Sequence, residues 1–337
     1  MEFDPLFRTL HLLSPGLYLT KEGGRLRIRR NGEEVESLPG HALNQIILHG
    51  RQAVSTGVLE YAAEEGIGVH FLAWDGTHYG LLHRSMSTHV DLHRRQFERD
   101  TDAEFRLVTA RAIVDGKLRN ARLVLRRYQR QRSVPEVDTA IDWVGNQLEE
   151  LPHARDVAAV RGHEGAAARA YYAGLSALLG DEWRFAGRVR RPPTDPVNAM
   201  LSYGYGVLIA NVLGIVSTHG LYPYLGVLHT AHHGQPALAS DLMEEFRPLV
   251  VDSVVLRLTL SRSVRPEEFE SDAGGCRMSA AVKQKFLQGL EGKLNANLTH
   301  PGNGLRMDYR RAIRHQTQRY ARAVLGEVPG YQAMTLR

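Results

Sequence analysis

The chain of 337 residues has almost no cysteine, because Cys276 is its only thiol. One thiol cannot build a disulfide framework, a cysteine-ligated zinc site or an iron–sulfur cluster, and it is typical of a reducing cytosol. A basic signal-like start is also lacking, since the chain begins Met1-Glu2-Phe3-Asp4-Pro5. We therefore expect no secretory signal peptide and a cytoplasmic protein.

Long uncharged runs are scarce as well. The run from Ala199 to Val216 has 18 residues without a charge, which is the lower edge of transmembrane length. It contains Ser202 and Asn211, and the Asp195-Pro196 pair before it is typical of a soluble helix with proline in its first turn. We expect a helix buried in a globular core and no membrane association.

The excess of positive charge is small, with 42 Lys and Arg against 37 Asp and Glu and a formal net charge of +5. Any argument for nucleic-acid binding therefore depends on where the charges lie. We find no internal repeat and no low-complexity tract. The length is large for a single hydrophobic core, which predicts two domains.

Strand and turn patterns dominate the first 86 residues. Residues 25–30 alternate apolar and polar side chains, and Asn31-Gly32 separates them from a possible partner strand over residues 33–38, which predicts a β-hairpin. A short helix is expected over residues 56–65, closed by Gly66. Further strands are expected at residues 45–49, 68–74 and 79–82.

Helix-forming residues dominate the rest of the chain. Residues 103–132 carry an apolar stripe at helical spacing that includes Ala110, Val114 and Leu118. Other helices are expected at residues 138–150, 154–179, 195–217, 241–260, 278–295 and 305–325. We predict an α+β fold with a small β-rich amino-terminal domain (residues 1–86), a linker (87–92) and a larger all-α domain (93–337).

Three residues in separate segments are candidate metal ligands, namely Glu164, His229 and Glu244. Two carboxylates and one imidazole suffice to bind a divalent cation such as Mg²⁺ or Mn²⁺. Each has an ordinary alternative: Glu164 as a solvated helical residue, and His229 as a loop residue. Asp241 could be a helix N-cap with Glu244 three residues later, in the manner of a capping box.

Two basic stripes are candidate DNA contacts. Residues 106–132 include nine Lys or Arg residues and a single acid, Asp115. A solvated helix face usually mixes both signs, so we expect these arginines to bind phosphate without sequence preference. The expected contacts are Arg119, Arg122, Arg126 and Arg130 on the first stripe, and Arg310 and Arg314 on the last helix.

Several ordered motifs resemble the CRISPR-associated endonuclease and integrase family Cas-one, over nearly the whole chain. The amino-terminal part of the resemblance includes Gln45-Ile46-Ile47-Leu48 and residues 62–72. The helical part includes Arg161-Gly162-His163-Glu164-Gly165, residues 195–205, Gly226-Val227-Leu228-His229, and Asp241-Leu242-Met243-Glu244-Glu245-Phe246-Arg247-Pro248.

The resemblance implies that Glu164, His229 and Glu244 are catalytic residues and bind Mg²⁺ or Mn²⁺, with Asp241 as an auxiliary acid. His163, next to Glu164, departs from the family pattern, as do His232 and His233, which crowd the loop after His229. These departures leave open whether another histidine helps in the site.

The resemblance also implies a chemistry and partners. A prespacer 3′-hydroxyl would attack a phosphodiester at the CRISPR leader–repeat boundary in a metal-dependent transesterification of double-stranded DNA. The β-rich domain would form a homodimer, and two homodimers would join a small partner, Cas-two, in a heterohexamer. A Cas-four nuclease would be a separate protein, because one cysteine cannot ligate its cluster.

Two alternatives stay open from the sequence. One is a metal-dependent nuclease that cuts branched or single-stranded DNA in repair with the same three ligands. The other is a non-catalytic DNA-binding scaffold in which the acidic residues cap helices.

Overall fold

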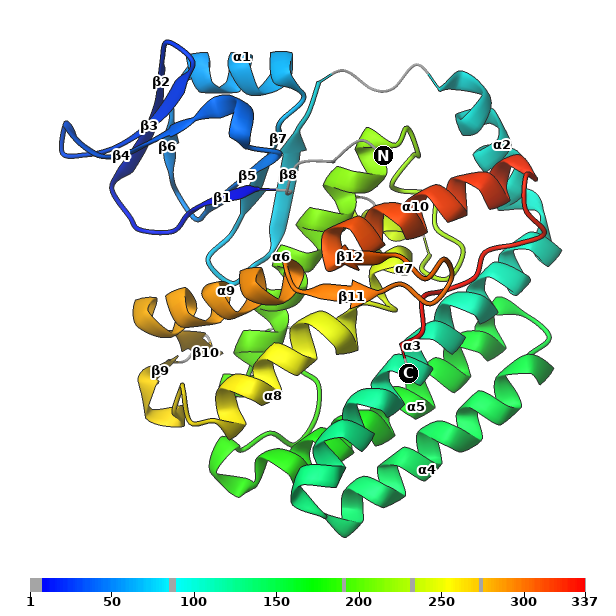
Figure 1. Ribbon diagram of the computed structural model, residues 1–337. Helices are drawn as coiled ribbons and strands as arrows, with labels where there is room; N and C mark the ends of the chain where they lie inside the picture. Colours follow the sequence, from blue (N-terminus) through cyan, green and yellow to red (C-terminus); the bar gives the residue numbers. More distant parts are fainter. Residues whose placement is uncertain (1–7, 85–88, 190–191, 231–233, 273–274, 337) are drawn as a thin grey trace. The chain divides into compact units, whose positions relative to one another are not determined.

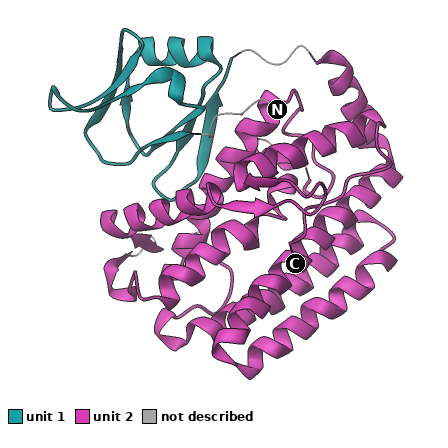
Figure 2. Ribbon diagram, viewed as in Figure 1, with its two compact units in different colours: residues 1–86 teal, residues 87–337 magenta. Residues whose placement is uncertain are grey.

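The computed structural model describes residues 8–84, 89–189, 192–230, 234–272 and 275–336. The chain divides into two compact units, residues 1–86 and residues 87–337 (Figure 2). Helix α2 begins at Val90, so the segment expected as a linker over residues 87–92 includes the first turn of a helix.

The first unit contains two four-stranded sheets and helix α1 (Figure 1). One sheet has the order β4-β3-β2-β6 and the other the order β1-β5-β7-β8. Their bounds are β1 Thr9–Leu12, β2 Leu17–Glu22, β3 Arg25–Arg30, β4 Glu33–Pro39, β5 Gln45–His49, β6 Ala53–Val54, β7 Gly68–Leu72 and β8 His78–Leu82. Leu12, Leu19, Leu26, Ile46 and Val69 belong to one buried cluster, so both sheets share a core.

The predicted hairpin is confirmed. Strands β3 and β4 pair antiparallel, and Asn31 and Gly32 between them have φ of 53° and 87°. Positive φ at both central residues is what a tight hairpin turn requires, and asparagine and glycine tolerate it best. Helix α1, Thr56–Glu65, ends as expected at Gly66 with φ of 72°.

The second unit is mainly helical. Its helices are α2 Val90–Thr101, α3 Ala103–Arg132, α4 Pro135–Glu150, α5 Val157–Leu179, α6 Pro196–Thr218, α7 Ala237–Met243, α8 Ser253–Leu260, α9 Ala280–Leu294 and α10 Tyr309–Leu325. Two small antiparallel ribbons that were not predicted accompany them, β9 Phe269–Asp272 with β10 Gly275–Met278, and β11 Asn297–Thr299 with β12 Arg306–Asp308. A β-rich region followed by a helical domain confirms the predicted fold class.

Helices α3, α4 and α5 pack against one another (Figure 1). The apolar stripe predicted on α3 is buried at Ala110, Val114 and Leu118. Among the described residues, α6 is the one helix long and apolar enough to cross a membrane, and 83% of its most apolar window is buried inside the protein. Asp195 caps α6 and Pro196 occupies its first turn, as expected for a core helix.

The prediction of a single helix over residues 241–260 is wrong. Helix α7 already begins at Ala237 after Pro236, and a π-helical segment, Pro248–Asp252, precedes α8. Pro248 has no backbone N–H to donate to the preceding turn, so a regular α-helix cannot pass through it undisturbed. The interruption lies directly after Glu244 and Arg247, two residues of the candidate site.

Candidate functional site

Glu164, His229 and Glu244 meet beside a lysine that sequence reasoning did not single out. Helix α5 supplies Glu164, the end of α7 supplies Glu244, and α3 supplies Lys117. The Lys117 Nζ contacts Glu164 Oε1 and lies 2.6 Å from Glu244 Oε2. His229 Nε2 lies 3.8 Å from Glu244 Oε1. Segments that are remote in the sequence therefore converge at one ammonium group.

Glu244 is an anion held in a buried position. Only 2% of its side chain is exposed, and Arg247 Nη1 donates to Oε1 at 2.7 Å. Burial alone would raise the pKa of Glu244, but the positive charges of Arg247 and Lys117 outweigh burial and lower it to about 2. Glu244 Oε2 is buried and lies against the Lys117 ammonium. This oxygen has charge and lone pairs to offer a cation.

Lys117 is the counter-ion of the two carboxylates. Burial would lower the pKa of this amine, yet the charges of Glu244 and Glu164 raise it, so the ammonium stays protonated at neutral pH. In the described part of the chain, no three Asp, Glu, His or Cys side chains are arranged as a metal-ligand group. The position between Glu164 and Glu244 is filled by Lys117 Nζ.

His229 is oriented by Asp241. Asp241 is fully buried, and its carboxylate accepts the backbone N–H groups of Val227, Leu228 and His229 at 2.7 to 2.9 Å. It also lies 2.6 Å from His229 Nδ1, which leaves Nε2 directed at Glu244. Burial would lower the pKa of His229, but the hydrogen bond to Asp241 and the charge of Glu244 raise it.

The helix-capping alternative for Asp241 and Glu244 is wrong. Asp241 lies in the last turn of α7, and Pro236 occupies the N-cap position. Asp241 does accept backbone N–H groups, but they belong to the loop that carries His229. Its carboxylate therefore shapes that loop.

A buried aromatic cluster supports Arg247. The Arg247 guanidinium carbon lies 4.2 Å from the centroid of the Tyr205 ring. The Tyr205 hydroxyl donates to Asp252, which also accepts the Tyr171 hydroxyl at 2.9 Å. Burial raises the pKa of Asp252 to about 6 despite these hydrogen bonds. Because Tyr171 is on α5, the helix of Glu164, the cluster connects the elements that carry the two carboxylates.

A cleft of about 480 Å³ opens beside Lys117 and Glu164. Gly165, Ala168 and Ala173 of α5 are among its lining residues, and such small side chains leave room near the carboxylate. The cations Arg169, Arg188 and Arg247 also line it. Arg188 donates to Asn198 and Ser202, both at 3.0 Å, which fixes its direction. A cleft lined by several cations and by the Glu164 carboxylate, with Glu244 on the other side of the Lys117 ammonium, suits a phosphate-containing substrate and a divalent cation.

Sequence reasoning missed Lys117, Arg188, Arg247 and Tyr205. A weak signal was present for two of them, since Arg247 lies in the same motif as Glu244, and Tyr205 ends the motif of residues 195–205. Lys117 belongs to a basic stripe, and nothing local shows that it alone turns towards Glu164.

The prediction that Arg310 contacts DNA is wrong. Its side chain is 1% exposed, and its guanidinium donates to Asn211 at 2.9 Å and to Glu291 at 2.6 Å. Asn295 accepts a further hydrogen bond at 2.9 Å. The guanidinium N–H groups of Arg310 point to these acceptors inside the protein. Arg310 therefore joins α10 to α6 and α9.

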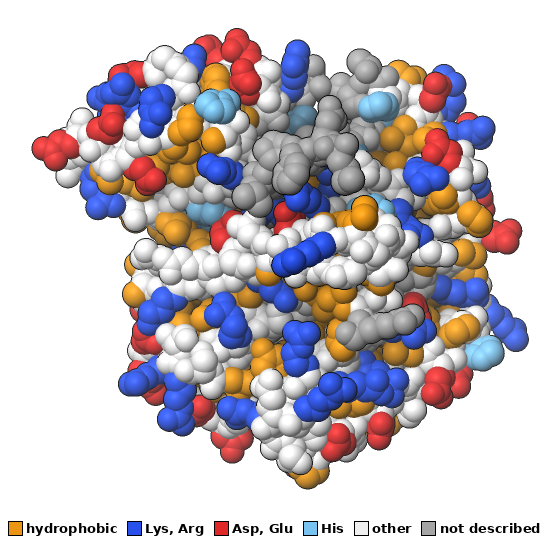
Figure 3. Space-filling model, in the orientation of Figure 1, with side chains coloured by type: hydrophobic (Ala, Val, Ile, Leu, Met, Phe, Trp, Pro, Cys, Tyr) orange, Lys and Arg blue, Asp and Glu red, His pale blue; other side chains and the backbone are white. Residues whose placement is uncertain are grey.

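The other predicted DNA contacts lie at or near the surface. Arg126, Arg130 and Arg314 are exposed. Arg119 is exposed too, but it pairs with Asp115 at 2.7 Å. Arg122 is half-buried and lies against Gly145 of α4. Figure 3 draws one face of the molecule, on which Lys and Arg side chains lie among hydrophobic, acidic and other side chains.

One of the three histidines that depart from the family pattern, His163, lies within the described residues. His163 Nδ1 lies 2.9 Å from Gln147 Oε1 of α4, so its ring is engaged with that helix. His232 and His233 lie outside the described residues.

Comparisons with known proteins agree with the resemblance read from the motifs. Residues 10–292 match the family model described as CRISPR associated protein Cas1, the Cas-one family. The CRISPR-associated endonuclease Cas1 3 of Thermus thermophilus is 37% identical over 332 residues, which cover 97% of each chain.

Two solved structures show the same fold. A casposase bound to its integration product has a TM-score of 0.87 at 21% identity, over 97% of this chain and 93% of that one. A chain of a Cas6-RT-Cas1–Cas2 complex has a TM-score of 0.86 at 20% identity, over 100% of this chain and 37% of that one. With the family match and the Thermus relative, the conclusion is that this chain belongs to the Cas1 family.

Proposed function

We propose that this chain is a divalent-metal-dependent DNA endonuclease and integrase of CRISPR adaptation. The observation that carries the proposal is the convergence of Glu164 and Glu244 at the Lys117 ammonium, with His229 beside Glu244 and a cleft lined by arginines next to Glu164. The relatives' names, a CRISPR-associated endonuclease and a casposase bound to an integration product, support the same class of chemistry. The substrate would be double-stranded DNA, as prespacer and as CRISPR leader–repeat.

The residues present fit a divalent cation. Glu244 Oε2 is buried and already faces a cation, the Lys117 ammonium, and His229 presents Nε2 because Asp241 holds Nδ1. A histidine ligand held by a carboxylate through its other nitrogen is the usual arrangement in metal sites. Glu164, His229 and Glu244 would hold Mg²⁺ or Mn²⁺. When bound, the metal would neutralise negative charge on the phosphoryl oxygens and stabilise negative charge on the attacking or leaving oxygen.

The chain's own residues would bind and orient the substrate. In the proposed reaction, a 3′-hydroxyl oxygen forms a new bond to phosphorus and the bond to another 3′-oxygen breaks, so phosphodiesters are exchanged without hydrolysis. Arg169 and Arg188 line the cleft and would neutralise the phosphates on either side of the reacting one. Arg247 would keep the Glu244 carboxylate ionised and in place.

We also propose the assembly that the comparisons suggest. The solved Cas6-RT-Cas1–Cas2 complex supports Cas2, the Cas-two of the family, as partner. The β-rich unit would form a homodimer, and the protein would work in the cytoplasm with a separate Cas-four nuclease. Co-purification of this chain with Cas2 as a heterohexamer tests this assembly.

A strand-transfer assay tests the proposed activity. The chain is mixed with Cas2, a labelled prespacer, a leader–repeat duplex and Mn²⁺, and Glu164→Gln and Glu244→Gln are compared with Glu149→Gln, an exposed residue of α4. We expect transfer products that chelator abolishes, that both site variants lose, and that Glu149→Gln keeps.

Two results would contradict the proposal. Cleavage of branched or single-stranded DNA without any transfer product would favour the repair nuclease. Wild-type turnover by folded Glu164→Gln protein would show that the carboxylate has no catalytic role.

A further inference from the structure

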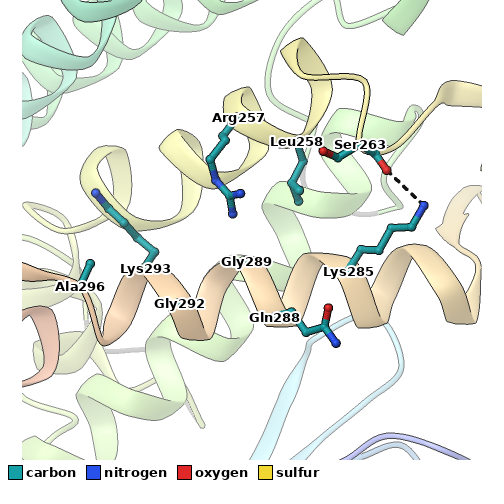
Figure 4. A pocket seen from close by; sticks show the side chains of 9 residues that line it. All are labelled: Arg257, Leu258, Ser263, Lys285, Gln288, Gly289, Gly292, Lys293 and Ala296. Atoms are coloured by element: carbon teal, nitrogen blue, oxygen red, sulfur yellow. Dashed lines mark hydrogen bonds between the residues drawn. The ribbon is translucent and has the colours of Figure 1, made fainter.

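A basic groove lies between α8 and α9, away from the candidate metal centre. The cavity has a volume of about 600 Å³. We call it the α8–α9 groove and define it by Arg257, Lys285, Gln288, Gly289, Gly292 and Lys293 (Figure 4). Its lining in the described chain includes neither Glu164 nor Glu244.

The cations follow the groove in a row. On α9, Lys285, Gly289 and Lys293 are four residues apart, which places successive positions about 6 Å apart along the helix axis. Figure 4 shows Lys285 and Lys293 on either side of Gly289, with Arg257 reaching towards α9 from α8. A linear row of positive charges matches an extended polyanion better than a compact one.

Two glycines keep the groove open. A Cβ atom at Gly289 would lie 2.7 Å from the Arg257 guanidinium, so a larger residue would displace that cation. A Cβ atom at Gly292 would meet nothing within 4 Å, which shows open space above this turn of α9. Glycine in the middle of a helix costs about 1 kcal/mol relative to alanine, and here it provides space between charged side chains.

The positive charge of the groove is poorly compensated. Lys285 pairs with Glu268 at 3.1 Å, but no Asp or Glu lines the groove in the part of the chain that the structure describes. Lys293 lies over the Tyr309 ring, at 4.6 Å from its centroid. Burial, together with the charges of Arg127 and Arg257, lowers the pKa of Lys293 to about 8. Each positive charge disfavours the protonated state of the neighbouring cations, and a bound anion would stabilise that protonated state.

Arg127 extends this basic surface beyond the groove. It is exposed on α3, and its charge acts on both Lys293 and Tyr309. Cations from α3, α8 and α9 therefore lie near one another. A surface of this kind suits the repeated phosphates of a nucleic-acid backbone, which are contacted without regard to base sequence.

We propose that the α8–α9 groove is a second DNA site, which binds the sugar–phosphate backbone of a substrate segment outside the candidate metal centre. The proposal rests on the proposed function for the identity of its ligand. Arg257 and Lys293 contact phosphates, Lys285 contributes less because Glu268 already pairs with it, and Gly292 leaves room for the strand.

Two matched substitutions test the groove without removing any contact. Gly292→Glu places a negative charge in the open space, and Gly292→Gln places a neutral side chain of the same size there. Affinity for a duplex of about 30 base pairs is measured in EDTA by fluorescence anisotropy. We expect Gly292→Glu to raise Kd about tenfold and Gly292→Gln to change it much less, because the repulsion acts on phosphate charge.

A neutralising pair provides a second test. Arg257→Gln with Lys293→Gln should lower the slope of log Kd against log salt by about 2, at about 0.9 per lost phosphate contact. The control is Arg30→Gln with Arg51→Gln, two exposed residues of the first unit that give the same change in net charge. Thermal unfolding and Mn²⁺ affinity are measured on every variant to show that the fold and the candidate metal centre are intact.

The outcomes separate the two proposals. The groove proposal is wrong if folded Gly292→Glu has the wild-type Kd and the pair Arg257→Gln with Lys293→Gln has the wild-type salt slope. This conclusion does not depend on the strand-transfer activity of the variants. Weakened duplex binding with unchanged Mn²⁺ affinity supports it. Loss of strand transfer in Glu164→Gln with unchanged duplex affinity concerns only the metal centre.

Discussion

Replacing Asp241 by asparagine should be much more damaging than its small change in size suggests. Asp241 Oδ2 accepts from the Val227 and Leu228 N–H groups, and Oδ1 accepts from the His229 N–H and faces Nδ1. An asparagine amide has one oxygen and one NH₂ group. Whichever way the amide turns, its NH₂ group faces two atoms that themselves donate.

The size of the effect follows from these contacts. A hydrogen bond to a charged group contributes about 1.5–3 kcal/mol, so the loss of two in a fully buried site corresponds to about 3–6 kcal/mol of unfolding free energy. In a domain of this size, each kcal/mol of lost stability lowers Tm by about 2–4 °C. Asp241→Ala, which leaves all four donors without an acceptor, should be at least as destabilising.

Urea unfolding and hydrogen exchange measure the effect. The amides of Val227, Leu228 and His229 should lose protection in Asp241→Asn, and the midpoint of unfolding should fall. Asp142→Asn, an exposed residue of α4, is the matched control and should stay within about 0.5 kcal/mol of wild type. If Asp241→Asn is as stable as that control, the account of the His229 loop is refuted.

Three further predictions concern the same unit. Lys117→Met should bind Mn²⁺ about tenfold more tightly in calorimetry, because a competing positive charge is gone; unchanged or weaker binding would contradict the role of Lys117 as counter-ion. The raised pKa of His229 means that its proton stabilises the metal-free fold at acid pH, a contribution lost as pH rises through that pKa. Mn²⁺ affinity should therefore fall when pH is lowered from about 8 to about 6, and a pH-independent affinity would exclude His229 as a ligand. Arg310→Gln should cost about 3 kcal/mol in chemical unfolding because it removes the buried positive charge that pairs with Glu291, whereas Arg126→Gln should leave stability unchanged and weaken DNA binding; equal stabilities of the two variants would refute the distinction.

Local patterns predicted the elements whose structure is decided locally. Asn31-Gly32 has the backbone preferences of a hairpin turn, and the apolar stripe of α3 follows from helical periodicity alone. The break near Glu244 has a signal in the sequence, Pro248, which the prediction of one helix over residues 241–260 did not use. The proline changes the backbone hydrogen bonds, and hydrophobic periodicity does not report those.

Side-chain partners across long sequence separations could not be predicted in the same way. Arg310 has the spacing of an exposed basic stripe, and only its contacts with Asn211 and Glu291 show that it is buried. Lys117 looks like its neighbours on α3 until α5 brings Glu164 beside it. The positions of Glu164, His229 and Glu244 came from motifs of the family, and their role as metal ligands stays a prediction.

The ammonium between Glu164 and Glu244 gives the acidic centre an internal substitute for an external ion. Mutual repulsion of the two carboxylates is thereby relieved during folding, before any cation arrives from solution. Unlike a small zinc domain, which collapses when stripped by a chelator, this helical unit should keep its structure under EDTA. Ion loading then becomes an exchange of one cation for another on a scaffold that is already assembled.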